Sequence, residues 1–294
     1  MLDLDVHAPP IVLDGGLSTA LEEQGADLTG ALWTARLLGE EPERIAAAHR
    51  AYFRAGARVA TTASYQASLD GLHAAGYDDA TARRLVTLSV RIARDVRDEV
   101  DPDLLVAASV GPYGAFLADG SEYRGRYGVP PARLRDFHAP RLELLAAAGP
   151  DLLAVETIPD SDEAEVLVRL LDELGVPAWF SYSVRGDTTC AGQPLADAYA
   201  VLSGCAAVVA AGVNCSDQED VLGAVTTAVA VTGRPGVAYP NRGGSWDPDT
   251  KKWAYGDPVD LDLVDGWLAA GAKLIGGCCG TGPTDVAALA ARVG

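Results

Sequence analysis

The sequence predicts an α/β protein in which eight strands alternate with eight helices. Short apolar runs alternate with longer amphipathic segments along the whole chain, and no linker, charge block or low-complexity stretch divides it. The length of 294 residues suits one large barrel, since such barrels typically have about 250 residues. We therefore expect residues 1–294 to form a single (β/α)8 TIM-type barrel domain. The alternative, a doubly wound open sheet, usually has fewer strands and a glycine-rich phosphate turn after the first one.

The eight expected strands are short apolar runs that end in polar residues or glycine. Barrel enzymes carry their chemistry at the carboxyl ends of the strands, so functional residues are expected where these runs end. In chain order the expected strands are Ile11–Asp14, Val59–Tyr65, Leu104–Val110, Asp151–Glu156, Ala178–Val184, Ala206–Cys215, Gly236–Pro240 and Lys273–Gly277.

The expected helices have recognisable ends. Glu41-Pro42-Glu43 begins a helix that runs through Ala55, since proline suits the first helical turn and acidic side chains favour the positive end of the helix dipole. Aspartate or serine caps begin two others, and glycine ends several. These other helices are expected from Asp78 or Asp79 to about Glu99, from Pro130 or Pro131 to Ala148, from Ser161 to Leu174, and over Pro194–Leu202, Gln218–Val231, Leu261–Ala270 and Asp285–Val293.

Composition narrows the function class and the compartment. A net charge of −18 argues against nucleic acid or an anionic membrane as a partner. No apolar stretch approaches the ~18 residues of a membrane span, and Met1–Pro10 lacks the basic start and apolar core of a signal peptide. Five cysteines, two of them adjacent, do not look like a secreted disulfide framework. We therefore expect a cytoplasmic protein with free thiols.

Three cysteines stand where two expected strands end. The run Gly276-Gly277-Cys278-Cys279-Gly280-Thr281 follows the last strand, and Cys215 ends the sixth. Adjacent side chains on a straight strand point to opposite faces, so one ion could hold Cys278 and Cys279 only if the backbone bends there, which the flanking glycines permit. Three converging thiolates would make a zinc site with its fourth position free for a substrate. The alternative is that these cysteines are buried apolar residues, which is how we interpret Cys190 and Cys205.

Five polar residues at the other strand ends are candidate substrate ligands. Asp14 and Glu156 could hold the ammonium group of an amino-acid substrate, or each could cap a turn or a helix start. Thr62, Ser64 and Asn241 could bind the substrate carboxylate or orient other ligands. Local hydrogen bonding to the backbone is an equally good explanation of these three.

Three long connections follow strands and should lie over the same mouth of the barrel. They are Gly15 to about Glu40, Gly111–Val129 and Asn241–Pro258, longer than usual for such barrels. The second and third could cover the site and exclude water, or their aromatic side chains could pack the loops onto the rim. These aromatic residues are Tyr113, Phe116, Tyr123, Tyr127, Trp246, Trp253 and Tyr255.

The residue types at the strand ends favour thiol activation over hydrolysis. No histidine ends an expected strand; His7, His49, His73 and His138 fall in the amino-terminal tail, in helices or near a helix start. We expect no general acid or base, because zinc holds a substrate thiol as the thiolate, and a neutral thioether leaves without needing a proton. A zinc-dependent hydrolase on the same barrel, or a zinc-binding protein without turnover, are the alternatives.

Seven motifs, in this order along nearly the whole chain, resemble those of the zinc-dependent homocysteine S-methyltransferases. The motifs are Asp14-Gly15-Gly16; Tyr52 to Ala57 leading to Thr61 to Gln66; Ser109 to Gly114 with Asp119 to Gly125; Glu156 to Pro159; Val213-Asn214-Cys215; Tyr239-Pro240-Asn241; and Gly276 to Thr281.

This resemblance implies a (β/α)8 barrel with zinc on Cys215, Cys278 and Cys279, homocysteine sulfur at the open position, and Asp14 and Glu156 near the homocysteine amino group. The stretch Ser109–Tyr127 is most similar to the branch that uses S-methylmethionine or S-adenosylmethionine. Betaine-using relatives have a tyrosine where this chain has Thr157, so the resting fourth ligand is left open.

These observations lead to one functional hypothesis. We expect transfer of a sulfonium methyl group from S-methylmethionine or S-adenosylmethionine to zinc-activated homocysteine, forming methionine. A glycine-rich nucleotide turn is missing from its usual place, which favours the smaller donor, S-methylmethionine. The alternatives are methylation of another small thiol or selenol, and the zinc-dependent hydrolase.

Overall fold

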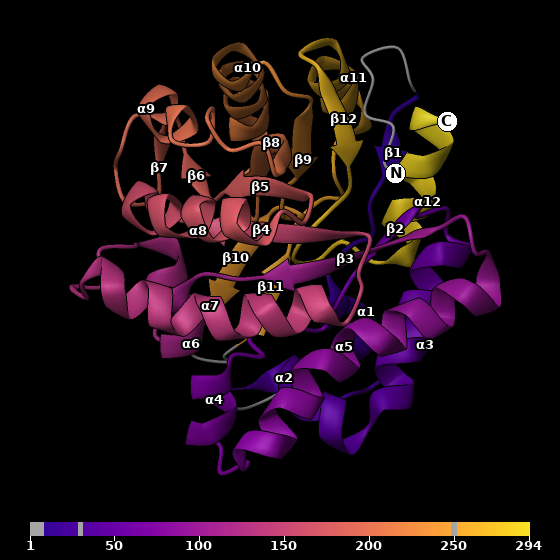
Figure 1. The fold of residues 1–294 in the computed structure, drawn as a ribbon. Coiled ribbons are helices and arrows are strands. Elements are labelled where there is room, and N and C mark those ends of the chain that lie inside the picture. Colours follow the sequence, from indigo (N-terminus) through magenta and orange to yellow (C-terminus); the bar gives the residue numbers. More distant parts are fainter. Residues whose placement is uncertain (1–8, 29–31, 248–251) are drawn as a thin grey trace.

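The computed structural model describes residues 9–28, 32–247 and 252–294 and has eight parallel strands in one sheet (Figure 1). An isolated parallel bridge between Leu13 and Val59 joins the first strand in the sheet order to the last. This bridge closes the sheet, so the expected (β/α)8 TIM-type barrel is confirmed. The sheet order is β1 (Ile11–Val12), β12 (Ala272–Ile275), β9 (Gly236–Tyr239), β8 (Val208–Asn214), β5 (Ala178–Tyr182), β4 (Leu152–Ile158), β3 (Leu105–Val110) and β2 (Val59–Thr61).

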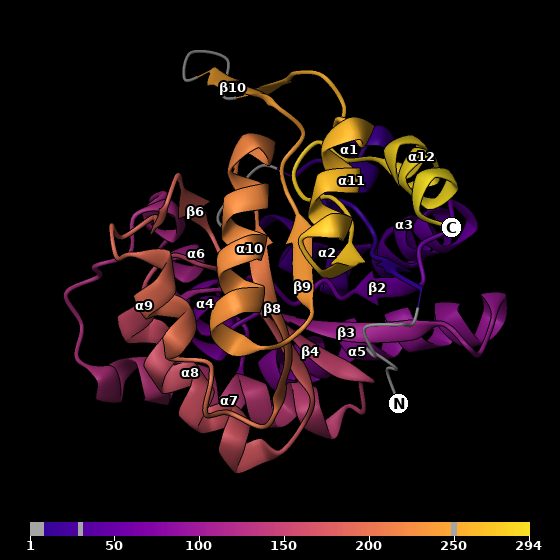
Figure 2. The same cartoon turned by 90° about the horizontal axis from the view of Figure 1, so that it is seen from above.

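All eight expected helices are present, and they surround the sheet (Figures 1 and 2). They are α3 (Pro42–Arg54), α5 (Asp79–Val100), α7 (Pro131–Ala147), α8 (Ser161–Leu174), α9 (Leu195–Ala200), α10 (Val221–Thr232), preceded by the short 3-10 helix η2 (Gln218–Asp220), α11 (Leu261–Ala269) and α12 (Pro283–Val293). Asp78 caps α5 by accepting a 2.7 Å hydrogen bond from the Thr81 amide. The cap of α8 is Asp160 rather than the expected Ser161, because Asp160 accepts from the Asp162 amide.

Several strands end before the position that the sequence predicts. The second strand stops at Thr61 rather than Tyr65, and the last stops at Ile275 rather than Gly277. The chain leaves the fifth at Tyr182, after which β6 (Val184–Arg185) pairs antiparallel with β7 (Thr188–Thr189). The physical reason is a change of hydrogen-bond partner at these ends. Beyond β12, the Gly277 and Cys278 amides donate to the carbonyls of Asp14 and Pro240, and beyond β2 the Ser64 amide turns back to the Thr62 carbonyl. An apolar run does not reveal that change of partner.

The barrel has two apolar layers. Alternate strand residues fill the interior, where the Trp179 indole donates a 2.9 Å hydrogen bond to the Tyr239 hydroxyl. A larger cluster lies between the sheet and the surrounding helices and includes Leu153, Val155 and Phe180. This packing fixes the strand ends that carry the candidate site residues.

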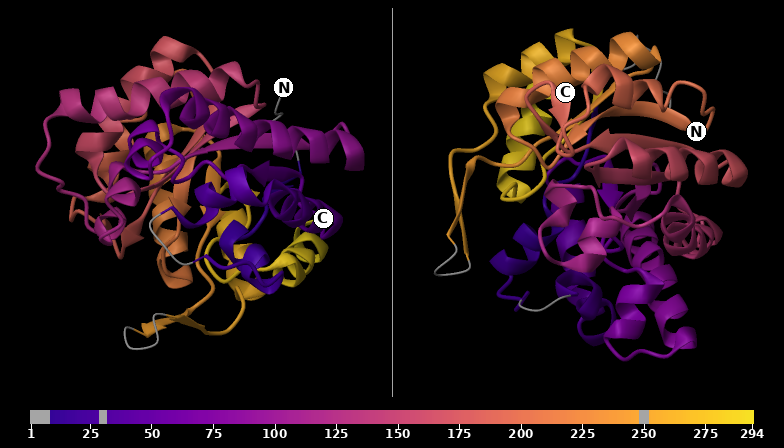
Figure 3. Two further views of the ribbon diagram at one scale, coloured as in Figure 1. Left: turned by 90° about the horizontal axis from the view of Figure 1, so that it is seen from below. Right: turned by 90° about the vertical axis from the view of Figure 1, so that its left-hand side faces the viewer.

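The long connections contain secondary structure of their own. The first holds α1 (Leu17–Glu23) and α2 (Trp33–Glu40), a shorter connection holds α4 (Leu69–Ala74), and the second long one holds α6 (Tyr113–Leu117) and the 3-10 helix η1 (Ser121–Tyr123). The third forms the antiparallel hairpin of β10 (Gly244–Asp247) and β11 (Lys252–Tyr255), which extends away from the barrel (Figures 2 and 3).

The aromatic residues of the second long connection divide between two roles. Tyr113 packs with its ring centroid 5.5 Å from that of Phe116, 5.5 Å from that of Tyr127 and 5.0 Å from that of Phe137 on α7. For these rings the structure favours packing onto the rim over a cover of the site, whereas Tyr123 reaches the site itself. The side chains of Trp246, Trp253 and Tyr255 lie outside the described part of the structure, as does His7.

Within residues 9–28, 32–247 and 252–294, every helix is too short or too polar to cross a lipid bilayer.

Candidate active site

The three cysteines expected to hold a metal come together at the carboxyl ends of β8 and β12. The Cys215 and Cys279 sulfurs are 3.8 Å apart, the Cys278 and Cys279 sulfurs are 4.0 Å apart, and all three lie within 4.8 Å of one another. Tetrahedral zinc with Zn–S bonds of about 2.3 Å requires sulfurs roughly 3.8 Å apart. The donor set and its spacing therefore fit a metal ion bound by three thiolates. Cys190 and Cys205 lie outside this cluster.

Close packing explains the glycines before the cysteine pair. A Cβ on Gly276 would lie 2.7 Å from the Asp14 carbonyl oxygen, and one on Gly277 would lie 2.3 Å from the Thr281 hydroxyl. Only a residue without a side chain fits at either position. The Cys278 amide donates to the Pro240 carbonyl over 2.7 Å, and the Thr281 amide closes the turn by donating to the Cys278 carbonyl over 3.1 Å. These contacts produce the bend that lets both thiols face Cys215.

A hydrogen-bonded pair fixes the other side of the triad. Cys215 and Thr157 both have left-handed backbone, with φ of 48° and 59°, a conformation that is costly for residues other than glycine. Between them, Asn214 accepts a 2.7 Å hydrogen bond from the Thr157 amide and donates a 2.8 Å bond to its hydroxyl. Asn214 therefore links the strained ends of β4 and β8. Its motif was visible in the sequence, but nothing there indicated this partner.

The two predicted carboxylates are buried in the same mouth. Asp14 is 5% exposed and accepts 2.6 Å and 2.8 Å hydrogen bonds from the amide and hydroxyl of Thr61. Glu156 is 8% exposed and accepts a hydrogen bond from the Ser109 hydroxyl. Burial raises the pKa of Asp14 to about 8, with a further contribution from the Glu156 charge, and burial raises the pKa of Glu156 to about 7. Two repelling buried carboxylates make a site that a cation would stabilise.

The three neutral polar candidates bond to the protein backbone or to each other. The Thr62 and Ser64 hydroxyls are 2.7 Å apart; Thr62 accepts from the Ser109 amide over 3.1 Å, and Ser64 donates to the Ser109 carbonyl over 2.7 Å. Asn241 accepts a 3.1 Å hydrogen bond from the Cys279 amide. The geometry gives Thr62 and Ser64 a structural task at β3, and Asn241 a task in orienting the cysteine turn. Direct substrate binding by these three stays a prediction.

Two tyrosines reach the site without having been singled out for it. The Tyr123 hydroxyl lies 3.1 Å from the Cys215 sulfur. Tyr65 is half-buried, and its pKa is raised well above 10 by burial and by the charges of Cys215, Glu122 and Glu156. Tyr123 was one of seven aromatic residues in the long connections, and only the folded path of η1 distinguishes it from the others.

Comparison with known proteins identifies the family. The profile of the homocysteine S-methyltransferase family matches residues 11–293. The homocysteine S-methyltransferase of Escherichia coli is 45% identical, with 96% of this chain and 94% of that protein covered. The homocysteine S-methyltransferase YbgG of Bacillus subtilis is 43% identical, with 98% and 95% covered.

Solved structures agree with these sequence comparisons. The metallated form of the homocysteine methyltransferase MmuM from Escherichia coli superposes with a TM-score of 0.88 at 44% identity, covering 97% of each chain. In sequence, the chain is also similar to a selenocysteine Se-methyltransferase of Brassica oleracea, at 40% identity over 96% of this chain and 88% of that protein. The chain belongs to the homocysteine S-methyltransferase family.

Proposed function

We propose that this chain transfers a methyl group from S-methylmethionine or S-adenosylmethionine to the sulfur of homocysteine, forming methionine, and that zinc on Cys215, Cys278 and Cys279 activates that sulfur. The observation that carries the proposal is the spacing of the three cysteine sulfurs, 3.8 Å and 4.0 Å between neighbours. Family membership supports the acceptor, and the thiolate-rich donor set supports zinc as the metal.

Zinc bound by three thiolates would supply an open position at which a substrate thiol is held as the thiolate at neutral pH. The chain's own groups do the rest. Asp14 and Glu156 are proposed to bind the ammonium group of homocysteine, a cation that would compensate the burial that raises the pKa of each carboxyl. Asn214 and Asn241 keep the cysteine backbone in place through their hydrogen bonds.

Methyl transfer itself needs no proton. The acceptor thiolate attacks the methyl carbon, and the carbon–sulfur bond of the sulfonium breaks with its electron pair going to the departing neutral thioether. The positions of the described histidines support a reaction without a general acid or base, since His49, His73 and His138 lie on α3, α4 and α7 rather than at strand ends. This distribution disfavours the alternative of a zinc-dependent hydrolase.

The acceptor range and the donor are finer points of the same proposal. A selenol such as selenocysteine is a second acceptor candidate, because a Se-methyltransferase is among the similar proteins. S-methylmethionine is the favoured donor, since a glycine-rich nucleotide turn is missing from its usual place.

We also infer that residues 1–294 act as one homocysteine-binding domain, which the single closed sheet supports. We infer a cytoplasmic location, because the three metal-binding thiols must stay reduced.

The first test is methionine formation by the purified, zinc-loaded protein from homocysteine, with S-methylmethionine, S-adenosylmethionine and betaine in parallel. We expect turnover with a sulfonium donor and its loss on chelation. Absence of methionine with every donor, in protein that retains one zinc per chain, would overturn the proposed acceptor.

A further inference from the structure

A third carboxylate in the mouth has been given no task. Glu122 on η1 is 9% exposed, and its Oε2 atom is buried without a hydrogen-bond partner among the described residues. Asp14 and Glu156 each accept hydrogen bonds from neighbouring hydroxyl or amide groups. Burying a carboxylate without a partner is costly, so such a group is expected to meet a ligand cation when the site is occupied.

The surroundings of Glu122 place it beside the cysteine triad. The hydroxyl of its neighbour, Tyr123, lies 3.1 Å from the Cys215 sulfur. Burial raises the pKa of Glu122, and the Cys215 charge adds to that increase. The charges of both Glu122 and Glu156 raise the pKa of Tyr65. Glu122 therefore lies near the same tyrosine as Glu156, the carboxylate proposed to bind homocysteine.

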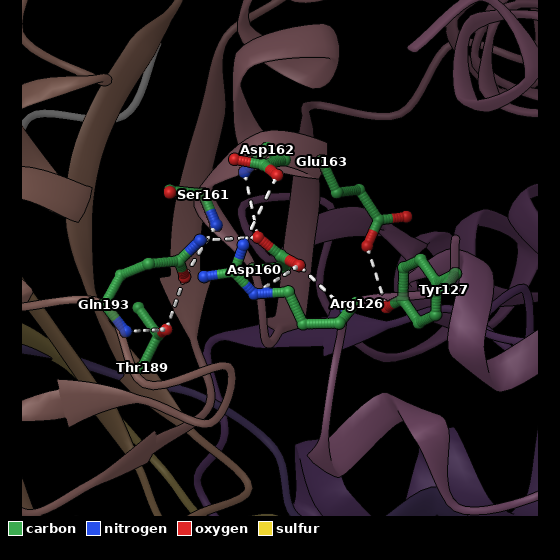
Figure 4. A network of polar contacts seen from close by, with 8 residues as sticks. All are labelled: Arg126, Tyr127, Asp160, Ser161, Asp162, Glu163, Thr189 and Gln193. Atoms are coloured by element: carbon green, nitrogen blue, oxygen red, sulfur yellow. Dashed lines mark hydrogen bonds and ion pairs between the residues drawn. The ribbon is translucent and has the colours of Figure 1, made fainter. Parts of the chain in front are cut away.

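The backbone holds Glu122 in a fixed position. A Cβ on Gly114 would lie 2.4 Å from the Glu122 amide nitrogen, which shows how closely α6 and η1 pack. On the other side, Asp160 accepts a 2.9 Å hydrogen bond from the Arg126 amide and a 2.6 Å bond from the Gln193 side chain (Figure 4). Glu122 is therefore packed against α6, and the segment after it is tied to the loop that follows β4, so the side chain is preorganised for a ligand.

We propose that Glu122 binds the ammonium group of the methyl donor, giving the mouth a second cation subsite distinct from Asp14 and Glu156. This inference rests on the proposed function. Both candidate donors carry an α-ammonium group as well as the sulfonium, and the aromatic face of Tyr65 suits a cationic neighbour. Asp14 and Glu156 would then bind the acceptor, and Glu122 would bind the donor.

The ammonium is a better partner for Glu122 than the sulfonium. During transfer the sulfonium loses its positive charge as its methyl carbon bonds to the acceptor thiolate, whereas the ammonium keeps its charge throughout. A carboxylate paired with the sulfonium would stabilise the ground state more than the transition state and so slow the reaction. Pairing with the ammonium stabilises both equally, so Glu122 should set the KM of the donor and leave kcat almost unchanged.

The test compares two ligands in the zinc-loaded protein and its Glu122→Gln variant. The ligands are S-methylmethionine and (3-carboxypropyl)dimethylsulfonium, which is S-methylmethionine without the amino group, both measured by calorimetry. Wild type should prefer S-methylmethionine at least tenfold. Glu122→Gln should weaken S-methylmethionine by about 10- to 100-fold and leave the affinity of the second ligand and the KM of homocysteine within threefold.

Asp119→Asn is the matched control, because it removes one negative charge from an exposed side chain of the same segment. It should leave both affinities unchanged. Equal binding of the two ligands by wild type overturns the proposal even if Glu122→Gln does not fold, and so does an equal loss for both ligands in the folded variant. Wild-type protein that makes no methionine from any sulfonium donor refutes the proposed function itself, whereas turnover with an unchanged Glu122→Gln variant refutes only this inference.

Discussion

Two groups of charged side chains are buried in this molecule, and they differ in where the opposite charge comes from. Between α7 and α8, Arg141 donates a 2.9 Å hydrogen bond to His138, which bonds over 2.8 Å to Glu163. Glu163 also accepts from the Tyr113 amide over 2.6 Å. Figure 4 shows a further bond to Glu163, from the Tyr127 hydroxyl over 3.0 Å. We call Arg141, His138 and Glu163 the helix network. It contains its own cation.

The barrel mouth contains carboxylates and thiols and no paired cation among its described groups. Asp14, Glu156 and Glu122 all have pKa values raised by burial, whereas Arg141 has its pKa lowered only to about 10 and stays charged at neutral pH. The charges of the helix network are paired with one another within the protein. Arg141 also donates a hydrogen bond to the Gly111 carbonyl and so holds the loop after β3. In the mouth, the proposed metal and cationic substrates would supply the opposite charge, an arrangement that is typical of a functional site.

The largest effect is expected from removing one metal-binding thiol from the barrel mouth. Cys279→Ser should abolish metal retention and lower turnover by at least about 1,000-fold, because a hydroxyl is a poor ligand beside two thiolates. The helix network and the barrel should remain intact, with an unchanged far-UV circular dichroism spectrum. Metal content and methionine formation are the measurements. Cys190→Ser, outside the cluster, is the control and should keep its metal; full activity of Cys279→Ser would contradict the site.

Breaking the helix network should instead reduce stability. Arg141→Met leaves Glu163 buried without its cation, so the free energy of unfolding should fall by about 3–5 kcal/mol, measured by urea denaturation. The loss should shrink at acidic pH, because removing the Arg141 charge raises the pKa of His138, which then supplies a cation. Arg135→Met removes an exposed ion pair to Glu173 from the same helix and should have little effect. Equal losses of unfolding free energy in Arg141→Met and Arg135→Met would show that the buried helix network stabilises the protein no more than an exposed ion pair does.

Removing one carboxylate from the barrel mouth should weaken substrate binding without lowering the stability of the protein. Glu156→Gln eliminates a repelling carboxylate, so the ligand-free protein should be at least as stable as wild type. The KM of homocysteine should rise about 10- to 100-fold, since an ammonium loses a charged partner. Denaturation and steady-state kinetics measure the two quantities. A large loss of stability with an unchanged KM would make Glu156 a structural residue like Glu163.

The smallest effect is a pH dependence of the metal-free protein. Burial raises the pKa of Asp14 from 3.8 to about 8 and that of Glu156 from 4.5 to about 7. At intermediate pH the folded protein binds protons that the unfolded chain has released, so stability falls as the pH rises through this window. Burial lowers the pKa of His49 and His138 from 6.5 to about 4, which opposes the trend only below pH 6.5.

The window for the carboxylates is therefore pH 6.5 to 8, where Asp14 and Glu156 should lower the free energy of unfolding by roughly 2 kcal/mol. Hydrogen bonds from the neighbouring thiols lower the pKa of Cys279, which opposes this trend in the metal-free protein, so the free energy of unfolding is followed in the Cys279→Ser background. Chemical denaturation of chelated protein at several pH values measures it. Glu156→Gln should lessen the slope, and stability that is flat or rises over this window would contradict the balance proposed for the mouth.

The sequence alone determined the alternation of strands and helices and the position of the cysteine turn. Apolar runs and helix caps are local signals, so all eight expected helices and all eight barrel strands exist. The glycine–cysteine run is visible in the sequence as well, although the contact that requires Gly276, with the Asp14 carbonyl, is a tertiary one. The strand ends carried most of the candidate residues for the same reason: barrel topology puts them at one mouth.

Only the tertiary structure decided which residues meet. Asn214 is hydrogen-bonded to Thr157, which lies 57 residues away in the sequence, and Tyr123 contacts Cys215, which lies 92 residues away. Arg141 on α7 is buried and donates a hydrogen bond to the Gly111 carbonyl. The same limit explains the strands that end early and the rings of Tyr113, Phe116 and Tyr127 that pack on the rim. The physical reason is that periodicity and capping report contacts along one element, whereas these partners depend on how separate loops pack at the barrel mouth.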